Sequence, residues 1–298
     1  MRKTKAEWIS TFRMMGDSIL RELSEVEKSA NDKASEINKR IKEHRENEIA
    51  SVNIVAKYEQ WDNQKLLHEI LLLTYASYIV MLEYRNKVWK YEYMAFARRI
   101  GELWEPFCKL AFVYSIKELT LIEPPLFDNV QAHIKKEVTE FIESLDLSEK
   151  IKEELKLYYE IPWTMVDSGG IKLGLDLHFE QNGVHYNCDF KSGFSSNEKG
   201  NTNRLLLVAS IYNLLGEKEK TVLFVRQAED ENNHYLQTLK NSPYWEVYCA
   251  DDGYDAMKKF TGFDMRKWLD ENVDWINDIS IELKLHLEQN GLLKYLTW

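Results

Sequence analysis

Two aspartates and a lysine in a short hairpin are the residues best suited to chemistry. Residues 176 to 191 read D-L-H-F-E-Q-N-G-V-H-Y-N-C-D-F-K. Asn182-Gly183 signals a two-residue type I′ turn, because both central positions of that turn need positive φ. With this turn, Asp176 lies opposite Asp189 in a non-hydrogen-bonded pair, whose Cα atoms are about 4.5 Å apart.

Alternation with a period of two divides the hairpin into two faces. The apolar face, expected to pack on a core, contains Leu173, Leu175, Leu177, Phe179, Val184, Tyr186, Cys188 and Phe190. The polar face contains Asp176, His178, Glu180, His185, Asn187, Asp189 and Lys191. Contact with water is the simpler interpretation of the polar face. However, two carboxylates about 4 Å apart repel by roughly 4 kcal/mol at an effective dielectric near 20, and opposed like charges destabilise a sheet. A bound cation would turn this repulsion into a binding site.

Lys191 completes the candidate site. It lies two residues beyond Asp189 and so points to the same face, about 7 Å along the strand. Carboxylates are hard oxygen ligands that suit Mg²⁺ or Mn²⁺. An ammonium group beside them can hold a metal-activated water and stabilise charge on a phosphorane-like transition state. The three residues therefore predict phosphodiester hydrolysis, and the histidines on the same face receive no role.

Asp176, twelve intervening residues and Asp189-Phe190-Lys191 resemble the D…(D/E)-x-K motif of the PD-(D/E)xK nuclease superfamily, which includes most type II restriction endonucleases, resolvases and repair nucleases. The resemblance implies a core made of a helix, a three-stranded antiparallel unit, a helix and a further strand, within about residues 95–226. It implies that Asp176, Asp189 and the backbone carbonyl of Phe190 bind Mg²⁺, for which Mn²⁺ can substitute. Asp176, Asp189 and Lys191 would be catalytic. Leu175 stands where the motif often has proline.

The three-residue part of the motif is not specific by itself. It also occurs at Glu154-Leu155-Lys156 and Glu282-Leu283-Lys284, but both copies lie in sequence expected to be helical. Asp167 is the alternative to Asp176 if the hairpin contains a bulge.

Many members of the superfamily add a glutamate from the helix that precedes the core. The stretch from 98 to 105 is similar to that helix. We prefer Glu105 to Glu102 as the fourth catalytic residue; an ordinary exposed helix acid is the other interpretation.

A polar loop is expected from Ser192 to Asn203, directly after the strand that carries Asp189. Asparagine can read adenine and arginine can read guanine in the major groove, and lysine can hold phosphate. The other interpretation is a linker that caps the next helix. The expected DNA contacts are Lys199, Asn201, Asn203 and Arg204.

Composition restricts the class of protein. The chain has 298 residues and 44% hydrophobic content, enough for one large domain or two ordinary ones. Its net charge of -10 argues against nucleic-acid binding, although the charge of a whole chain says little about the field in one cleft. Three widely spaced cysteines without a C-x-x-C pair indicate a reducing, cytoplasmic location and disfavour zinc.

No targeting segment or membrane span is expected. Residues 1 to 5 lead into an amphipathic helix rather than the apolar region of a signal peptide. The longest apolar tract, Ile70 to Leu82, is shorter than the roughly 20 residues that span a bilayer, and we interpret it as a buried helix.

The chain is expected to be α/β in the broad sense that includes α+β, with a mixed-sheet, restriction-endonuclease-like core. Residues 1–160 form a mainly helical region for dimerisation or DNA recognition, and it supplies the first core helix near 95–115. Residues 161–298 form the α/β nuclease core with C-terminal helices. The apolar run Thr221 to Val225 is typical of a strand buried on both faces.

These observations together predict a Mg²⁺-dependent type II restriction enzyme that cuts double-stranded DNA as a homodimer. A structure-specific or repair nuclease of the same fold is one alternative. A non-enzymatic helical interaction protein with an accidental pair of acids is the other.

Overall fold

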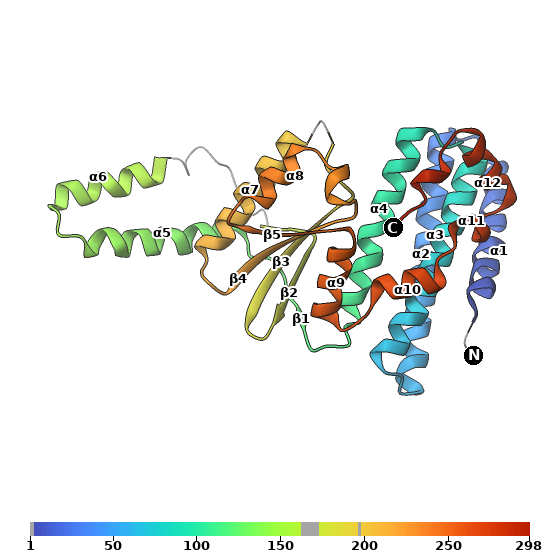
Figure 1. Cartoon of the computed structure of the whole chain (residues 1–298), viewed down its shortest axis with the longest axis horizontal. Coiled ribbons are helices and arrows are strands. Elements are labelled where there is room, and N and C mark those ends of the chain that lie inside the picture. The colour runs from blue at the N-terminus through green and yellow to red at the C-terminus, as the bar shows by residue number, and fades with distance from the viewer. Residues whose placement is uncertain (1–2, 162–172, 196–197) are drawn as a thin grey trace. The chain divides into compact units, whose positions relative to one another are not determined.

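The computed structural model describes residues 3–161, 173–195 and 198–298 (Figure 1). The chain is α+β, with helices and a five-stranded mixed sheet. It divides into two compact units. Unit 1 comprises Met1–Glu118, Arg226–Ala228 and Cys249–Trp298, and unit 2 comprises Leu119–Val225 and Glu229–Tyr248.

Unit 1 is helical. Its helices are α1 (Lys5–Ser24), α2 (Ala30–Tyr58), α3 (Asn63–Val88), α4 (Tyr93–Val113), α9 (Ala250–Thr261), α10 (Met265–Asn272), α11 (Trp275–Asp278) and α12 (Ile281–Gln289), with a 3-10 turn at Leu293–Tyr295. The long helix α3 contacts α1, α2, α4 and α12, so it is the centre of this unit. Trp268 and Trp275 pack on it, since both are buried and the ring of Trp275 lies 4.9 Å from that of Tyr75.

The apolar tract in α3 forms a buried helix, as the sequence predicted. Among the described residues, α3 is the one helix that is long and apolar enough to cross a membrane. However, 89% of its most apolar 18-residue window is buried inside the protein. Its N-terminus is capped by Asp62, whose carboxylate accepts the N–H of Lys65 at 2.7 Å. An apolar helix surrounded by other helices needs no lipid to cover it.

The first helices are separated by a short break. Helix α1 ends at Ser24 and α2 starts at Ala30, with Ser29 as its cap. Helix α4 continues past Pro106 to Val113, although proline removes one helical donor. Burial of the apolar residues that follow Pro106 offsets this loss.

Unit 2 contains the sheet, with strand order β1-β2-β3-β4-β5. The strands are β1 (Thr120–Leu121), β2 (Leu177–Gln181), β3 (Val184–Lys191), β4 (Glu219–Val225) and β5 (Trp245–Cys249). Strand β2 is antiparallel to β1 and β3, whereas β4 is parallel to β3. Residues 221–225 are all buried, as predicted for a strand covered on both faces.

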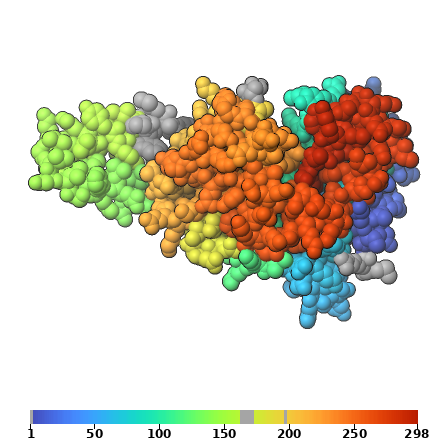
Figure 2. Space-filling view, in the orientation of Figure 1, coloured from blue at the N-terminus to red at the C-terminus, as the bar shows by residue number. Residues whose placement is uncertain are grey.

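The helices of unit 2 are α5 (Phe127–Ser144), α6 (Glu149–Glu160), α7 (Lys199–Leu214) and α8 (His234–Lys240), with a 3-10 turn at Glu229–Glu231. Helix α7 crosses from β3 to β4 and packs against β4 and α8. Helices α5 and α6 form a hairpin that extends from the sheet (Figure 1), and their atoms are the light green part at the left of the space-filling view (Figure 2). One core cluster joins α5 and α7 to the start of β2 through Val130, Ile134, Leu173, Val208, Ile211 and Tyr212.

The compact units do not follow the predicted division at residue 160. Residues 119–160 belong with the sheet, and the helices after residue 249 belong with the N-terminal helices. The apolar faces of the C-terminal helices are buried on α3 and α4, and this long-range pairing has no local signal in the sequence.

Candidate functional site

The turn that sets the register of the hairpin forms as predicted. Asn182 and Gly183 have φ values of 55° and 75°, as a type I′ turn requires. The pairs run from Gln181↔Val184 to Leu177↔Cys188, so Asp176 immediately precedes β2 at the position opposite Asp189. The predicted register is therefore confirmed.

Asp176 is attached to the neighbouring strand by its carboxylate. Its Oδ2 accepts the backbone N–H of Phe190 at 2.8 Å. This bond holds the carboxylate one residue beyond Asp189 along β3 and leaves Oδ1 for another ligand.

Asp189 is buried, with 1% of its surface exposed. Its Oδ1 forms an ion pair with the ammonium of Lys191 but accepts no hydrogen bond of ordinary geometry from the described residues. Its Oδ2 lies 3.3 Å from Nη2 of Arg204. Burial raises the pKa of Asp189, and the charge of Asp176 adds to this effect, whereas Lys191 and Arg204 oppose it.

The carboxylate oxygens of Asp176 and Asp189 are ligands that suit a hard divalent cation. Asp176, just before β2, is bonded to the residue that follows Asp189 on β3, and one buried oxygen of Asp189 has only an ion-pair partner. Within the described residues, no group of three or more His, Cys, Asp or Glu side chains is arranged to hold a metal ion. Mg²⁺ commonly binds through one or two carboxylates and keeps several waters, so a two-acid site fits it better than it fits zinc.

The rest of the polar face forms a hydrogen-bond network that is buried at His178 and Asn187 and partly exposed at His185. Nδ1 of His178 lies 2.7 Å from Oδ1 of Asn187, and Nδ2 of Asn187 donates to Glu219 at 2.7 Å. The other carboxylate oxygen of Glu219 lies 2.7 Å from Nδ1 of His185. Helix α7 covers this face, since the ring of Tyr212 lies 6.1 Å from that of His178.

His178 is a neutral positioning group in this network. Its Nε2 accepts the N–H of Leu175 at 2.9 Å, so the ring proton is on Nδ1 and is donated to Asn187. Burial lowers the pKa of His178, and its hydrogen bonds oppose this shift. The bond to Leu175 holds the chain next to Asp176.

Glu219 was missed by the sequence analysis. The predicted strand began at residue 221, and nothing in the sequence indicated how β4 pairs with β3. Parallel pairing sets His185 beside Glu219 and Asp189 beside Leu223, so the first residues of β4 complete the network. A buried polar network of this kind is stabilising only when its members are satisfied.

The predicted polar loop is shorter than expected. Helix α7 begins at Lys199, so the four expected DNA contacts lie in its first two turns and not in a loop. Lys199 and Asn203 are exposed, and the amide of Asn201 donates to Glu198 at 3.0 Å. Arg204 points to Asp189 and is a member of the acidic site. The first turns of α7 bury Thr202 and Leu205, and this burial offsets the low helix propensity of the glycine and asparagines there.

The remaining candidates lie elsewhere or outside the described residues. Glu105 is on α4 in unit 1, with its carboxylate 2.7 Å from Lys109, and Glu102 pairs with Arg98 and Arg99. The role that the resemblance implies for Glu105 stays a prediction. Asp167 lies outside the described residues. The other two copies of the three-residue motif lie on α6 and α12, as expected.

No family model, no curated protein and no solved structure matches the chain.

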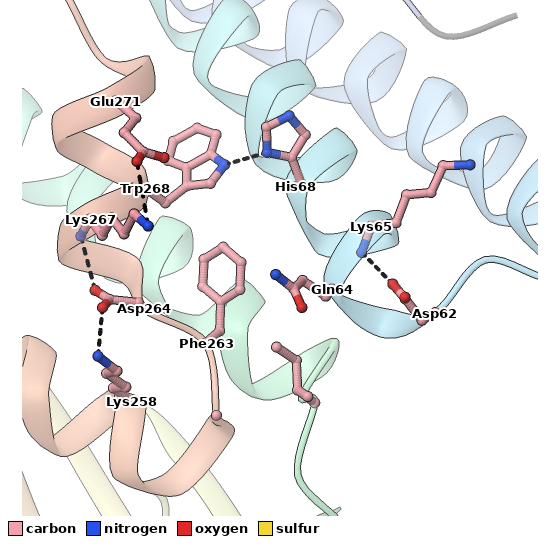
Figure 3. Close-up of a pocket in the computed structure, with 12 residues that line it drawn as sticks. Asp62, Gln64, Lys65, His68, Lys258, Phe263, Asp264, Lys267, Trp268 and Glu271 are labelled. Atoms are coloured by element: carbon pink, nitrogen blue, oxygen red, sulfur yellow. Dashed lines mark hydrogen bonds and ion pairs between the residues drawn. The ribbon is translucent and has the colours of Figure 1, made fainter.

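A cavity of about 610 Å³ lies in unit 1, between the start of α3 and helices α9 and α10 (Figure 3). Nε1 of Trp268 donates to Nδ1 of His68 at 3.0 Å across it. Two lysines of its lining are paired with carboxylates: Lys258 with Asp264 at 2.6 Å and Lys267 with Glu271 at 3.7 Å. Because these charges are matched, we assign no reaction to this cavity.

Proposed function

We propose that this protein is a Mg²⁺-dependent nuclease of the PD-(D/E)xK kind that hydrolyses phosphodiester bonds in double-stranded DNA. The observation that carries the proposal is the junction of Asp176, Asp189 and Lys191. The carboxylate of Asp176 accepts the N–H of Phe190, the residue after Asp189 on β3, and the ammonium of Lys191 contacts the buried carboxylate of Asp189.

The order of elements supports the same conclusion. Along the chain, helix α4 is followed by the antiparallel strands β1, β2 and β3, then by α7, and then by β4 parallel to β3. This is the order that the resemblance implies for the nuclease core. The hairpin of α5 and α6 is inserted between its first two strands.

Each residue of the site has a distinct task. Asp176 and Asp189, with the carbonyl of Phe190, would hold Mg²⁺, which supplies an activated water and neutralises charge on the phosphate. Lys191 would give up its ion pair with Asp189 and hold the attacking water or the phosphate oxygen. Arg204, beside Asp189, is available for the adjacent phosphate.

We propose further that the enzyme is a type II restriction endonuclease acting as a homodimer. A two-fold dimer has two matching active sites and would cut both strands of a palindromic sequence. The large helical unit provides surface for recognition, and Lys199 and Asn203 are exposed in the first turns of α7. Neither the helical unit nor these two exposed residues indicates a particular target sequence.

The decisive experiment is cleavage of plasmid DNA by the purified protein with Mg²⁺. We expect discrete fragments from the wild type, and cleavage reduced at least about a hundredfold in Asp189→Asn and Lys191→Ala, as for the loss of other charge-stabilising groups. Lys218→Ala, an exposed lysine in the turn before β4, is the matched control and should cut normally.

Other outcomes have defined meanings. Cleavage that survives in both variants would contradict the proposal. Ragged products without a fixed sequence would favour the structure-specific nuclease. If calorimetry found no Mg²⁺ binding that depends on Asp176 and Asp189, the non-enzymatic interaction protein would become the first choice.

A further inference from the structure

Three arginines line a second cavity in unit 1, between the first half of α2, the end of α3 and the start of α4. Its volume is about 270 Å³. The residues that matter here are Asn38, Arg85, Trp89, Tyr91, Arg98, Arg99 and Glu102.

Arg85 is buried without a carboxylate partner. Only 8% of its surface is exposed, and its guanidinium carbon lies 3.9 Å from the ring centre of Tyr91 and 4.7 Å from that of Trp89. Nη1 donates to the carbonyl of Trp89, and no described carboxylate forms an ion pair with it. Burial lowers the pKa of Arg85. A buried cation that lacks a counter-ion is costly, which makes the site receptive to an anion.

Arg98 and Arg99 share one carboxylate. Glu102 lies 2.6 Å from Arg98 and 3.3 Å from Arg99. Three arginines less one glutamate leave a local charge of +2 in a chain whose net charge is -10. Guanidinium groups match the oxygens of phosphate through paired N–H donors.

Two buried polar atoms of the cavity lining make no hydrogen bond of ordinary geometry with the described residues. They are the hydroxyl of Tyr91, a residue that is 3% exposed, and Oδ1 of Asn38. The hydroxyl of Tyr91 lies beside Arg99: burial raises the pKa of Tyr91, and the charges of Arg99 and Arg85 and the contact with the Arg99 side chain oppose this. Buried polar atoms without partners are rare, and a ligand is one reason for them.

Trp89 supplies a flat apolar surface at the same cavity. It is 43% exposed, and it follows directly on α3. An exposed indole beside cationic groups favours stacking of a planar ring, as in many sites that bind bases.

We propose that this cavity binds the phosphate ester of a nucleotide. Arg85, Arg99 and the Tyr91 hydroxyl bind the phosphate, and Trp89 stacks on the base. The phosphate belongs either to a free nucleotide or to a DNA strand. The inference does not depend on the nuclease proposal, because all the residues involved lie in unit 1, away in sequence from the acidic motif.

The test is calorimetric titration without Mg²⁺, with deoxyadenosine 5′-monophosphate as the probe and deoxyadenosine as the phosphate-free control. We expect the monophosphate to bind and the nucleoside to bind much more weakly. Arg99→Gln should weaken binding at least about tenfold, and Arg99→Lys should weaken it less, because it keeps the charge but loses the fork. Lys39→Gln, an exposed α2 residue outside the cavity, is the control.

A second arm identifies the source of the phosphate. A short DNA duplex is titrated into the same variants in EDTA. If the duplex alone binds in an Arg99-dependent way, the cavity holds a DNA phosphate; if the mononucleotide does, it holds a free nucleotide. If Arg99→Gln does not fold, Trp89→Ala replaces it, with loss of binding expected. The proposal is overturned if neither probe binds in a way that depends on these residues, or if deoxyadenosine binds as well as its monophosphate.

Discussion

At the scale of residues, the acidic site combines two opposing effects on one carboxylate. Asp189 loses hydration because it is buried, and Asp176 repels it, so its pKa is raised; Lys191 and Arg204 supply the positive charge that keeps this burial tolerable. A carboxylate in this situation gains more from a divalent cation than an exposed one, since the cation removes both the repulsion and the need for water.

The raised pKa predicts how stability depends on pH in metal-free protein. A carboxyl whose pKa is higher in the folded state favours folding most when it is protonated, so its burial becomes more costly as pH rises through the folded pKa. At a pH below 3.8, the ordinary pKa of an aspartate, the carboxyl is protonated in both states and its burial no longer lowers the stability. Asp189→Asn should therefore unfold at a higher urea concentration than the wild type near about pH 8, and the difference should shrink toward about pH 4.

Asp146→Asn is the control for this measurement, because Asp146 is exposed between α5 and α6. It should show no such pH-dependent difference. An Asp189→Asn variant that is less stable than the wild type throughout would mean that the ion pairs with Lys191 and Arg204 outweigh the burial.

Binding of Mg²⁺ should follow the same residue. If Asp189 binds Mg²⁺ as proposed, its protonation removes a ligand, so the affinity for Mg²⁺ should fall as pH is lowered toward the raised pKa. Calorimetric titration of the wild type at several pH values measures this. Equal affinity at about pH 8 and about pH 5 would show that Asp189 does not bind the ion.

At the scale of elements, the hairpin of β2 and β3 sets the geometry of the site. The register depends on a two-residue turn, and a slip by one residue would send the side chain of Asp189 to the opposite face of the sheet. The partner strand β4 then encloses the polar face, because Glu219 binds both Asn187 and His185.

Gly183→Val should disturb this element. Gly183 has φ +75°, and nothing lies within 4 Å of an added Cβ, so the change strains the backbone without a clash. We expect a loss of about 1–2 kcal/mol in the free energy of unfolding, with lower nuclease activity. Gly183→Asn is the matched variant, since asparagine tolerates positive φ, and it should cost less. Full activity in Gly183→Val would argue against the importance of the turn.

At the scale of the whole molecule, distant parts of the chain close the helical unit. Arg13 on α1 binds both carboxylate oxygens of Glu83 on α3, at 2.6 and 3.0 Å, and also donates to the carbonyl of Asp278. Glu83 is 2% exposed and accepts the N–H of Ser280. One buried carboxylate thus joins segments about 200 residues apart in the sequence.

Arg13→Ala should destabilise this unit by about 3–5 kcal/mol, because it leaves the charge of Glu83 buried without its partner. Lys39→Ala, which removes an exposed pair 3.9 Å from Glu43, should change stability by less than about 1 kcal/mol. Urea unfolding followed by tryptophan fluorescence compares the two. Similar effects of both substitutions would mean that the Arg13 pair is not important for folding.

The proposed homodimer is also tested at this scale. Sedimentation equilibrium should give twice the chain mass of 35.3 kDa for the active protein, and cleavage should become second order in protein at high dilution. A monomer that cuts both strands at one site would contradict the two-fold arrangement.

The sequence alone determined those features that depend on nearby residues. The turn at Asn182-Gly183 needs positive φ, so it predicted the register and, through strict alternation, the shared face of Asp176, Asp189 and Lys191. The continuous apolar tract from Ile70 to Leu82 likewise predicted the buried helix α3.

Tertiary structure decided what depends on distant partners. The pairing of β4 beside β3, which gives Glu219 its place, and the contact of Arg204 with Asp189 both require α7 to fold back on the sheet. The grouping of the C-terminal helices with α3 and the cavity around Arg85 also arise only when segments far apart in the chain bury a common surface. Each segment contributes only part of the buried surface, so the residues of one segment do not by themselves indicate where it packs.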